Sequence, residues 1–189
     1  MKVTEALQGK LAAIELLVLD VDGVLTQGDI IYTDTGVEAK TFDVKDGLGI
    51  RVASDSGLQL VLMTARASRA VERRARDLRI SEVLERVGDK GAALRRLAED
   101  KGIALEQVAF MGDDLNDREA MRLVGVSIAP ADAVAEIREE ADLVTEAPGG
   151  RGAAREAVEA VLRAQGRWEE AVSRYLEELA ERDRARRAE

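Results

Sequence analysis

The sequence of 189 residues contains neither cysteine nor histidine. The lack of cysteine excludes disulfide bonds, thiol nucleophiles and thiolate metal sites. The lack of histidine excludes histidine-based catalytic triads, histidine-ligated zinc and phosphohistidine chemistry. Any acid–base catalysis must therefore rely on carboxylates, lysine, tyrosine or metal-bound water.

Aromatic residues are also scarce, at 3%, so a core must be built from the leucine, valine, isoleucine and alanine that dominate the 46% hydrophobic content. The length fits a single domain spanning residues 1–189. No apolar run approaches the length of a membrane span, and the first residues lack the apolar stretch and cleavage site of a secretory signal. We therefore expect a soluble, cytoplasmic protein with no membrane partner.

Lysine and arginine are fewer than aspartate and glutamate, so the net charge is −9. Bulk charge of this sign argues against binding to nucleic-acid backbones or to anionic membranes. An anionic small molecule is still an acceptable ligand, since a metal ion or a local lysine or arginine can override the overall field.

Short apolar runs alternate with helical patterns along the chain. Strands are predicted at 16–22, 59–64 and 108–114, with shorter ones at 126–129 and 142–145 and a weaker one at 82–87. Helices are predicted at 68–79, 90–101, 116–124, 131–140 and 152–166. This alternation predicts an α/β fold, a doubly wound, Rossmann-like parallel sheet with helices on both faces.

Two segments depart from the alternation. Residues 28–44 have β-rich arms around the turn sequence TDTG, which predicts a β-hairpin inserted after the first strand. A lone hairpin is marginally stable, so pairing with another subunit would stabilise it. The charged segment 166–189 is predicted to be a C-terminal helix, either solvated or in contact with another subunit.

Polar groups follow three of the predicted strands. Asp20 and Asp22 end the first strand, Thr64 ends the second and Asp113 ends the third. Ligands bind beyond the carboxyl ends of the strands in doubly wound sheets, so these groups converge at one rim if the strands are neighbours. Asp20, a main-chain carbonyl and Asp113 offer the oxygen ligands that Mg²⁺ prefers.

Taken singly, each of these residues has an ordinary structural explanation. Asp20 could cap a turn, and Thr64 could cap the helix that follows it. Lys90 is typical of the first turn of a surface helix, and Asp114 and Asp117 could cap the next helix. The combination is far more specific than its parts.

The motifs DVDGVLT, a threonine after the next strand, a lysine, and GDDLND, in that order, resemble the haloacid dehalogenase superfamily over residues 16–130. The resemblance implies a phosphatase in which Asp20 attacks phosphorus and Asp22 exchanges the proton. It also implies that Thr64, Ala65 and Lys90 bind the phosphate group. Asp20, Asp22 and Asp113 are expected to bind Mg²⁺, and Asp114 and Asp117 to orient these metal ligands.

The segments DVDGVLTQGDIIYTDTGVEAKTFDVKDGLGIR, GDDLND and ADLVTEAPGGRGAAREAVEAVL are similar to the capless phosphatases that act on 3-deoxy-D-manno-octulosonate 8-phosphate, an acid sugar phosphate of lipopolysaccharide biosynthesis. That resemblance implies no cap domain and a homotetramer in which the hairpins form a central barrel. It also implies that Arg66, Asp46 and Arg151 contact the substrate, with Arg151 reaching a neighbouring subunit's site.

Two departures from that family's pattern keep alternatives open. The family usually has Thr-Gly-Arg where this chain has Thr64-Ala65-Arg66, and a more polar loop where this chain has VGDKGAAL around Lys90. Phosphatases of nonulosonate 9-phosphates share much of the pattern. A non-catalytic domain, either receiver-like or an assembly subunit, is the alternative from another class.

Overall fold

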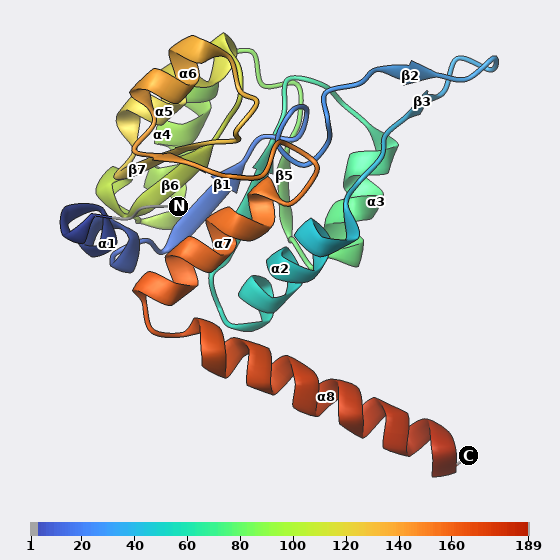
Figure 1. Cartoon of the computed structure of the whole chain (residues 1–189). Helices are drawn as coiled ribbons and strands as arrows, with labels where there is room; N and C mark the ends of the chain where they lie inside the picture. The colour runs from blue at the N-terminus through green and yellow to red at the C-terminus, as the bar shows by residue number, and fades with distance from the viewer. Residues whose placement is uncertain (1–3, 189) are drawn as a thin grey trace.

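The computed structural model describes residues 4–188, which are built around a six-stranded parallel sheet (Figure 1). The strand order is β5-β4-β1-β6-β7-β8. The strands are β1 (Leu16–Leu19), β4 (Gln59–Met63), β5 (Glu82–Leu84), β6 (Val108–Met111), β7 (Val126–Ala129) and β8 (Leu143–Val144). The predicted doubly wound parallel sheet is confirmed, and each predicted strand is present within its predicted range.

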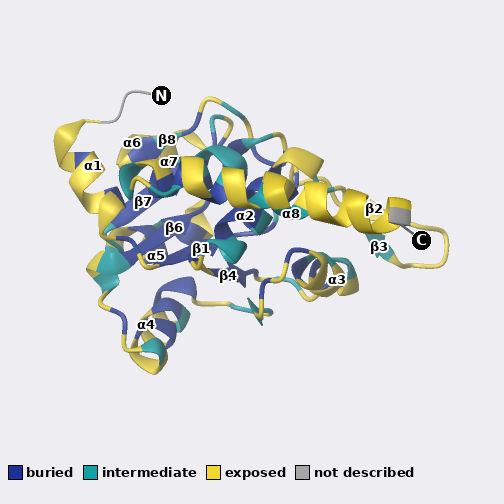
Figure 2. Cartoon of the chain, turned by 90° about the horizontal axis from the view of Figure 1, so that it is seen from below, coloured by how far each residue is buried: buried dark blue, intermediate teal, exposed yellow. Residues whose placement is uncertain are grey.

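Helices cover both faces of the sheet. On one face pack α1 (Glu5–Ala12), α2 (Val44–Asp55), α3 (Arg69–Asp77) and α7 (Ala153–Ala164), and on the other α4 (Lys90–Lys101), α5 (Arg118–Leu123) and α6 (Ala135–Glu140). Successive residues of β1 alternate between these two cores, Leu17 on the first and Val18 on the second. Because both faces are covered, the central strands are buried throughout and read as continuous apolar runs (Figure 2).

The sequence analysis predicted neither α1 nor α2. Two glycines, Gly47 and Gly49, weaken the helical signal of α2, because glycine disfavours a helix interior by about 1 kcal/mol. In the fold a Cβ at Gly49 would lie 2.3 Å from Cδ of Arg155 on α7. The glycine therefore permits a close approach of two helices, which a single-segment pattern does not reveal.

Two elements extend from this body. The hairpin strands β2 (Ile31–Tyr32) and β3 (Glu38–Ala39) pair antiparallel with each other in a separate two-stranded sheet and project beyond α3 (Figure 1). Helix α8 (Trp168–Ala188) packs its first two turns against the body, where Trp168 is buried beneath Arg155, and then continues outward with mostly exposed side chains (Figure 2). Within residues 4–188 no helix has the length and apolar content to cross a membrane.

Candidate active site

The site forms where three neighbouring strands end. Strand β1 lies between β4 and β6, with Leu19 in register with Leu62 on one side and Met111 on the other. The chain segments that follow these strands therefore meet at one rim, as predicted. They enclose a cavity of about 230 Å³ lined by Asp20, Asp22, Gly28, Thr64, Ala65, Arg66, Lys90, Asp113, Asp114 and Asn116.

Asp20 is buried and faces a buried cation. Nζ of Lys90 lies 2.9 Å from Oδ2 of Asp20 and also donates to Oδ1 of Asp117. Burial raises the pKa of Asp20 to about 7, helped by the charge of Asp117 and opposed by Lys90. Burial tends to lower the pKa of Lys90, but its two carboxylate partners raise it overall, so the lysine stays protonated.

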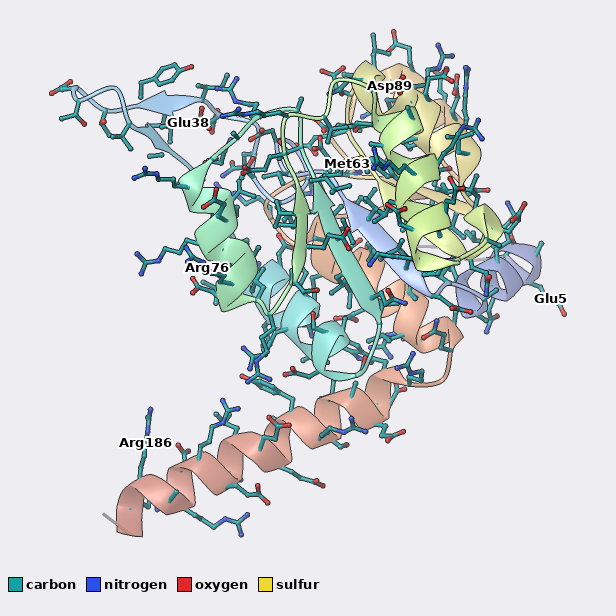
Figure 3. The ribbon with its side chains drawn as sticks, turned by 180° about the vertical axis from the view of Figure 1, so that it is seen from behind. Glu5, Glu38, Met63, Arg76, Asp89 and Arg186 are labelled. Carbon is teal, nitrogen blue, oxygen red and sulfur yellow. The ribbon has the colours of Figure 1, made fainter. Side chains whose placement is uncertain are left out.

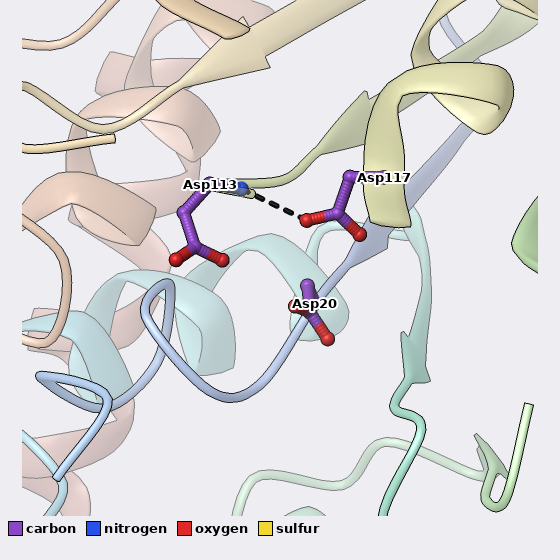
Figure 4. Close-up of side chains that lie close together, drawn as sticks. All are labelled: Asp20, Asp113 and Asp117. Carbon is purple, nitrogen blue, oxygen red and sulfur yellow. Dashed lines mark hydrogen bonds between the residues drawn. The ribbon is translucent and has the colours of Figure 1, made fainter. Parts of the chain in front are cut away.

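The carboxylate of Asp117 holds the segment that follows β6 in place. Its Oδ2 accepts the backbone N–H of Asp113 at 3.0 Å (Figure 4). The same oxygen accepts the backbone N–H of Asp114 at 3.3 Å. Since its other oxygen is paired with Lys90, both oxygens of this fully buried carboxylate are engaged. The contacts fit the orienting role that the sequence analysis predicted for Asp117, whereas Asp114 caps the short helical turn that begins at Leu115.

The same carboxylates suit a hard metal ion. One oxygen from each of Asp20, Asp113 and Asp117 lies within 4.8 Å of the others. Burial raises the pKa of Asp113 to about 8, with further contributions from the charges of Asp20 and Asp117. Crowded carboxylates at a cavity wall are an arrangement that a divalent cation relieves, and oxygen ligands favour Mg²⁺. The residues present therefore fit a magnesium ion.

Gly23, in the segment that follows β1, lies against Asp113, in the segment that follows β6. The backbone at Gly23 has φ +90°, and a Cβ there would lie 2.0 Å from Oδ2 of Asp113. A side chain would thus be strained and would displace the carboxylate. This explains the glycine of the DVDG motif in terms of the site itself.

Thr64 presents a hydroxyl that the fold holds in place. It is buried, its N–H donates to the carbonyl of Leu84, and its Oγ1 accepts the N–H of Arg66 at 3.2 Å. Helix α3 begins at Arg69, with Ser68 as its N-cap residue, so Thr64 is not a helix cap. The exposed Ala65 beside it leaves its backbone at the cavity wall.

Asp22 has a partner that the sequence analysis missed. Nζ of Lys40 donates to Oδ1 of Asp22 and lies 2.9 Å from Oε1 of Glu38, whose Oε2 accepts from Arg66 at 2.5 Å. The carboxylate of Asp22 thus points to Lys40 and lies outside the cluster formed by the carboxylates of Asp20, Asp113 and Asp117. Its predicted place among the metal ligands stays a prediction.

Two predicted substrate residues lie away from the cavity wall. Both carboxylate oxygens of Asp46 accept backbone N–H groups at the start of α7, from Gly152 at 3.0 Å and Arg155 at 2.9 Å. Arg151 is exposed and donates to the side chain of Gln27 at 3.2 Å. Within one subunit, Asp46 acts as a helix anchor, and Arg151 faces solvent beside the first loop.

Larger hollows exist elsewhere, one of about 510 Å³ between α1 and α7 and one of about 650 Å³ at the amino ends of the strands. Neither gathers the hydroxyl, lysine and carboxylates described above. We therefore assign the chemistry to the smaller cavity at the carboxyl ends of the strands.

Comparison with known proteins identifies the family. A family model described as haloacid dehalogenase-like hydrolase matches residues 79–155. The 3-deoxy-D-manno-octulosonate 8-phosphate phosphatase KdsC of Escherichia coli strain B is 43% identical over 169 residues, which cover 89% of this chain and 90% of that protein. The chain belongs to this phosphatase family. The KdsC phosphatase of Haemophilus influenzae is 38% identical over 85% of the chain and 89% of its own length.

Solved structures of the phosphatase family share the fold. The enzyme of Moraxella catarrhalis, in complex with magnesium, phosphate and KDO, matches with a TM-score of 0.86 and 39% identity over 89% of this chain and 97% of that one. A cobalt-bound enzyme of Haemophilus influenzae matches with a TM-score of 0.80 and 38% identity over 83% and 92%. The superfamily resemblance seen in the motifs is thereby confirmed. Within residues 4–188 no cap domain follows Asp22 or Thr64, where the chain forms only the hairpin, α2, α3 and β5.

Proposed function

We propose that this protein hydrolyses 3-deoxy-D-manno-octulosonate 8-phosphate with the help of Mg²⁺. The observation that carries the proposal is the convergence of Asp20, Lys90, Thr64 and Asp113 on one cavity, in a chain 43% identical to a phosphatase of that substrate. The Moraxella catarrhalis relative, which holds magnesium, phosphate and KDO, supports both the metal and the substrate.

The chain's own groups supply a two-step route. A carboxylate oxygen of Asp20 attacks phosphorus, the bond from phosphorus to the sugar oxygen breaks, and protonated Asp22 gives its proton to that oxygen. Water then attacks the aspartyl-phosphate and passes a proton to Asp22, which releases phosphate and restores Asp20. In a chain without histidine, Asp22 takes the acid–base role.

Positive and polar groups hold the transferring phosphoryl group during both steps. Lys90 and the hydroxyl of Thr64 face the cavity at the nucleophile, where they offset the charge of the phosphoryl oxygens. Asp20 and Asp113 would hold Mg²⁺, with Asp117 orienting Asp113 and the N–H groups around it. When bound, the metal neutralises charge on the phosphoryl group and lets it approach an anionic nucleophile.

We further propose that four subunits assemble through their hairpins. The hairpin exposes Ile30, Ile31, Tyr32 and Val37, with exposed fractions of 42–65%. Its two strands, β2 and β3, pair with no other strand in the described chain. An apolar surface of this kind is typical of a subunit interface. A neighbour could then bring Arg151 to the carboxylate of the acid sugar, which an arginine binds in bidentate fashion. A cytoplasmic location stays a prediction, which cell fractionation would test.

The deciding experiment is phosphate release from a panel of sugar phosphates with Mg²⁺ and with excess chelator. We expect turnover of 3-deoxy-D-manno-octulosonate 8-phosphate above that of nonulosonate 9-phosphates and hexose phosphates, with none in chelator. The variant Asp20→Asn should lose roughly a thousandfold or more, equal to about 4 kcal/mol in the barrier. A preference for nonulosonate 9-phosphates would show that the proposed substrate is wrong. Full activity of Asp20→Asn would contradict the proposed mechanism.

A further inference from the structure

The active-site acid is held by the stem of the hairpin. Lys40 directly follows β3, and its ammonium group donates to Oδ1 of Asp22. The Lys40 side chain is 2% exposed, whereas that of Asp22 is 27% exposed. The base of an otherwise exposed hairpin therefore delivers a buried cation to the one carboxylate that must exchange a proton.

Lys40 has a second carboxylate that keeps it in place. Glu38, whose position at the hairpin stem is labelled in Figure 3, lies with Oε1 2.9 Å from Nζ of Lys40. The other oxygen of Glu38 accepts from Arg66 at 2.5 Å, and Arg66 lines the cavity. A chain of alternating charges, Asp22–Lys40–Glu38–Arg66, thus joins the loop after β1 to the loop after β4.

This arrangement fixes the direction of the Asp22 side chain. The Lys40 side chain is buried and lies between two carboxylates, so its ammonium group has little freedom to move. Glu38 is in turn held by Arg66, which lines the cavity. The pairing with Lys40 therefore restricts the rotation of the Asp22 carboxylate.

We propose that Lys40 is a positioning residue, which orients the Asp22 carboxylate toward the leaving oxygen of the substrate. The proposal rests on the phosphatase function proposed above. It distinguishes Lys40 from a lysine that only fastens the hairpin, because the effect of Lys40 passes through Asp22. It also makes the hairpin stem part of the catalytic machinery.

The first test compares two substrates that differ in their need for an acid. Aryl phosphates such as p-nitrophenyl phosphate have a good leaving group, whereas the sugar alkoxide must be protonated as it departs. We expect Lys40→Met to lower kcat for the sugar phosphate about tenfold or more, with a clearly smaller loss in aspartyl-phosphate formation from p-nitrophenyl phosphate in rapid-mixing experiments. Lys40→Arg should recover part of the loss.

The matched control is Lys10→Met, because Lys10 also pairs with a carboxylate, Asp142 at 3.0 Å, but far from the cavity. We expect it to leave both rates unchanged. If Lys40→Met fails to fold in thermal denaturation, Glu38→Gln replaces it. That variant removes the carboxylate that holds Lys40 in place, so we expect the same selective loss.

The second test is a double-mutant cycle in the Asp22→Asn background. If Lys40 acts through Asp22, adding Lys40→Met to Asp22→Asn should cost less than about twofold, since the group it orients is already gone. Equal losses for both substrates, or a full additional loss in the double variant, would overturn the proposal and assign Lys40 to substrate binding or to folding. A wild-type enzyme that releases no phosphate would instead contradict the proposed function.

Discussion

Nζ of Lys90 lies 2.9 Å from Oδ2 of Asp20, and the two side chains are 2% and 6% exposed. The ammonium of Lys90 is shared with Asp117, which is fully buried. One lysine therefore balances two carboxylates in a desolvated position, and this relationship makes the site sensitive to a single substitution.

We expect Lys90→Met to destabilise the metal-free protein by about 3–5 kcal/mol, because it leaves Asp20 and Asp117 buried without a counterion. Urea unfolding in chelator measures the loss, and Mg²⁺ should reduce it by supplying positive charge. Lys10→Met removes a half-exposed partner of Asp142 and should cost under about 1 kcal/mol. Equal effects of the two variants would contradict the buried pairing.

The stability of the metal-free protein should fall as pH rises from about 4 to about 8. The pKa of Asp20 is raised from 3.8 to about 7 and that of Asp113 from 3.8 to about 8 by folding. In this window the folded state binds more protons than the unfolded state, so the free energy of unfolding decreases with pH. The chain has no histidine, so no other side chain with an ordinary pKa titrates between pH 5 and 8.

Unfolding free energies at several pH values in chelator provide the measurement. Asp113→Asn should flatten the decline, because it removes one of the two titrating groups. Saturating Mg²⁺ should also weaken it, since metal binding displaces the protons. A stability that is constant or rises over pH 5–8 in chelator would show that burial and mutual repulsion do not raise the pKa of these two carboxylates in the folded protein.

Gly23 and Gly36 both have a positive φ, so replacing each with alanine separates the effect of backbone strain from that of a steric clash. Gly23 and Gly36 have φ values of +90° and +77°, but only at Gly23 would a Cβ meet Asp113, while at Gly36 nothing lies within 4 Å. We expect Gly23→Ala to abolish most Mg²⁺-dependent turnover and to raise the Mg²⁺ concentration that is needed. Gly36→Ala should retain turnover. A similar loss in both variants would attribute the effect to backbone strain alone.

Subunit exchange tests the proposed role of Arg151 in a neighbour's site. Arg151→Ala should raise KM for the acid sugar phosphate and leave p-nitrophenyl phosphate turnover unchanged, because only the acid sugar offers a carboxylate to the guanidinium. Mixing it with Asp20→Asn should restore part of the sugar-phosphate activity through hybrid sites. Light scattering that reports a monomer, or no recovery after verified exchange, would count against the assembly.

Groups that follow the strands could be placed from sequence because their position depends only on strand order. Asp20, Thr64 and Asp113 come directly after apolar runs, and parallel packing takes the ends of such runs to one rim. Lys90 was expected at the site only from the superfamily resemblance, and it opens α4 at the same rim. For Asp20, Thr64 and Asp113 local pattern and topology agree, and the cavity gathers them.

Contacts between distant segments could not be read in the same way. The pairing of Lys40 with Asp22 depends on how the hairpin stem returns to the body, and nothing in the sequence TDTGVEAK specifies it. The anchoring of α7 by Asp46 joins residues more than a hundred positions apart. Sequence reasoning assigned Asp46 to the substrate, but both its oxygens are engaged by backbone N–H groups of α7.

The central place of β1 in the sheet has a consequence for how the chain is made. Leu16–Leu19 emerges early in synthesis, yet one of its two hydrogen-bonding partners, Val108–Met111, follows about ninety residues later. Until then one side of a fully apolar strand is unpaired, which is the state in which nascent chains aggregate. A chain released before Met111 would thus hold its nucleophile beside an open strand edge.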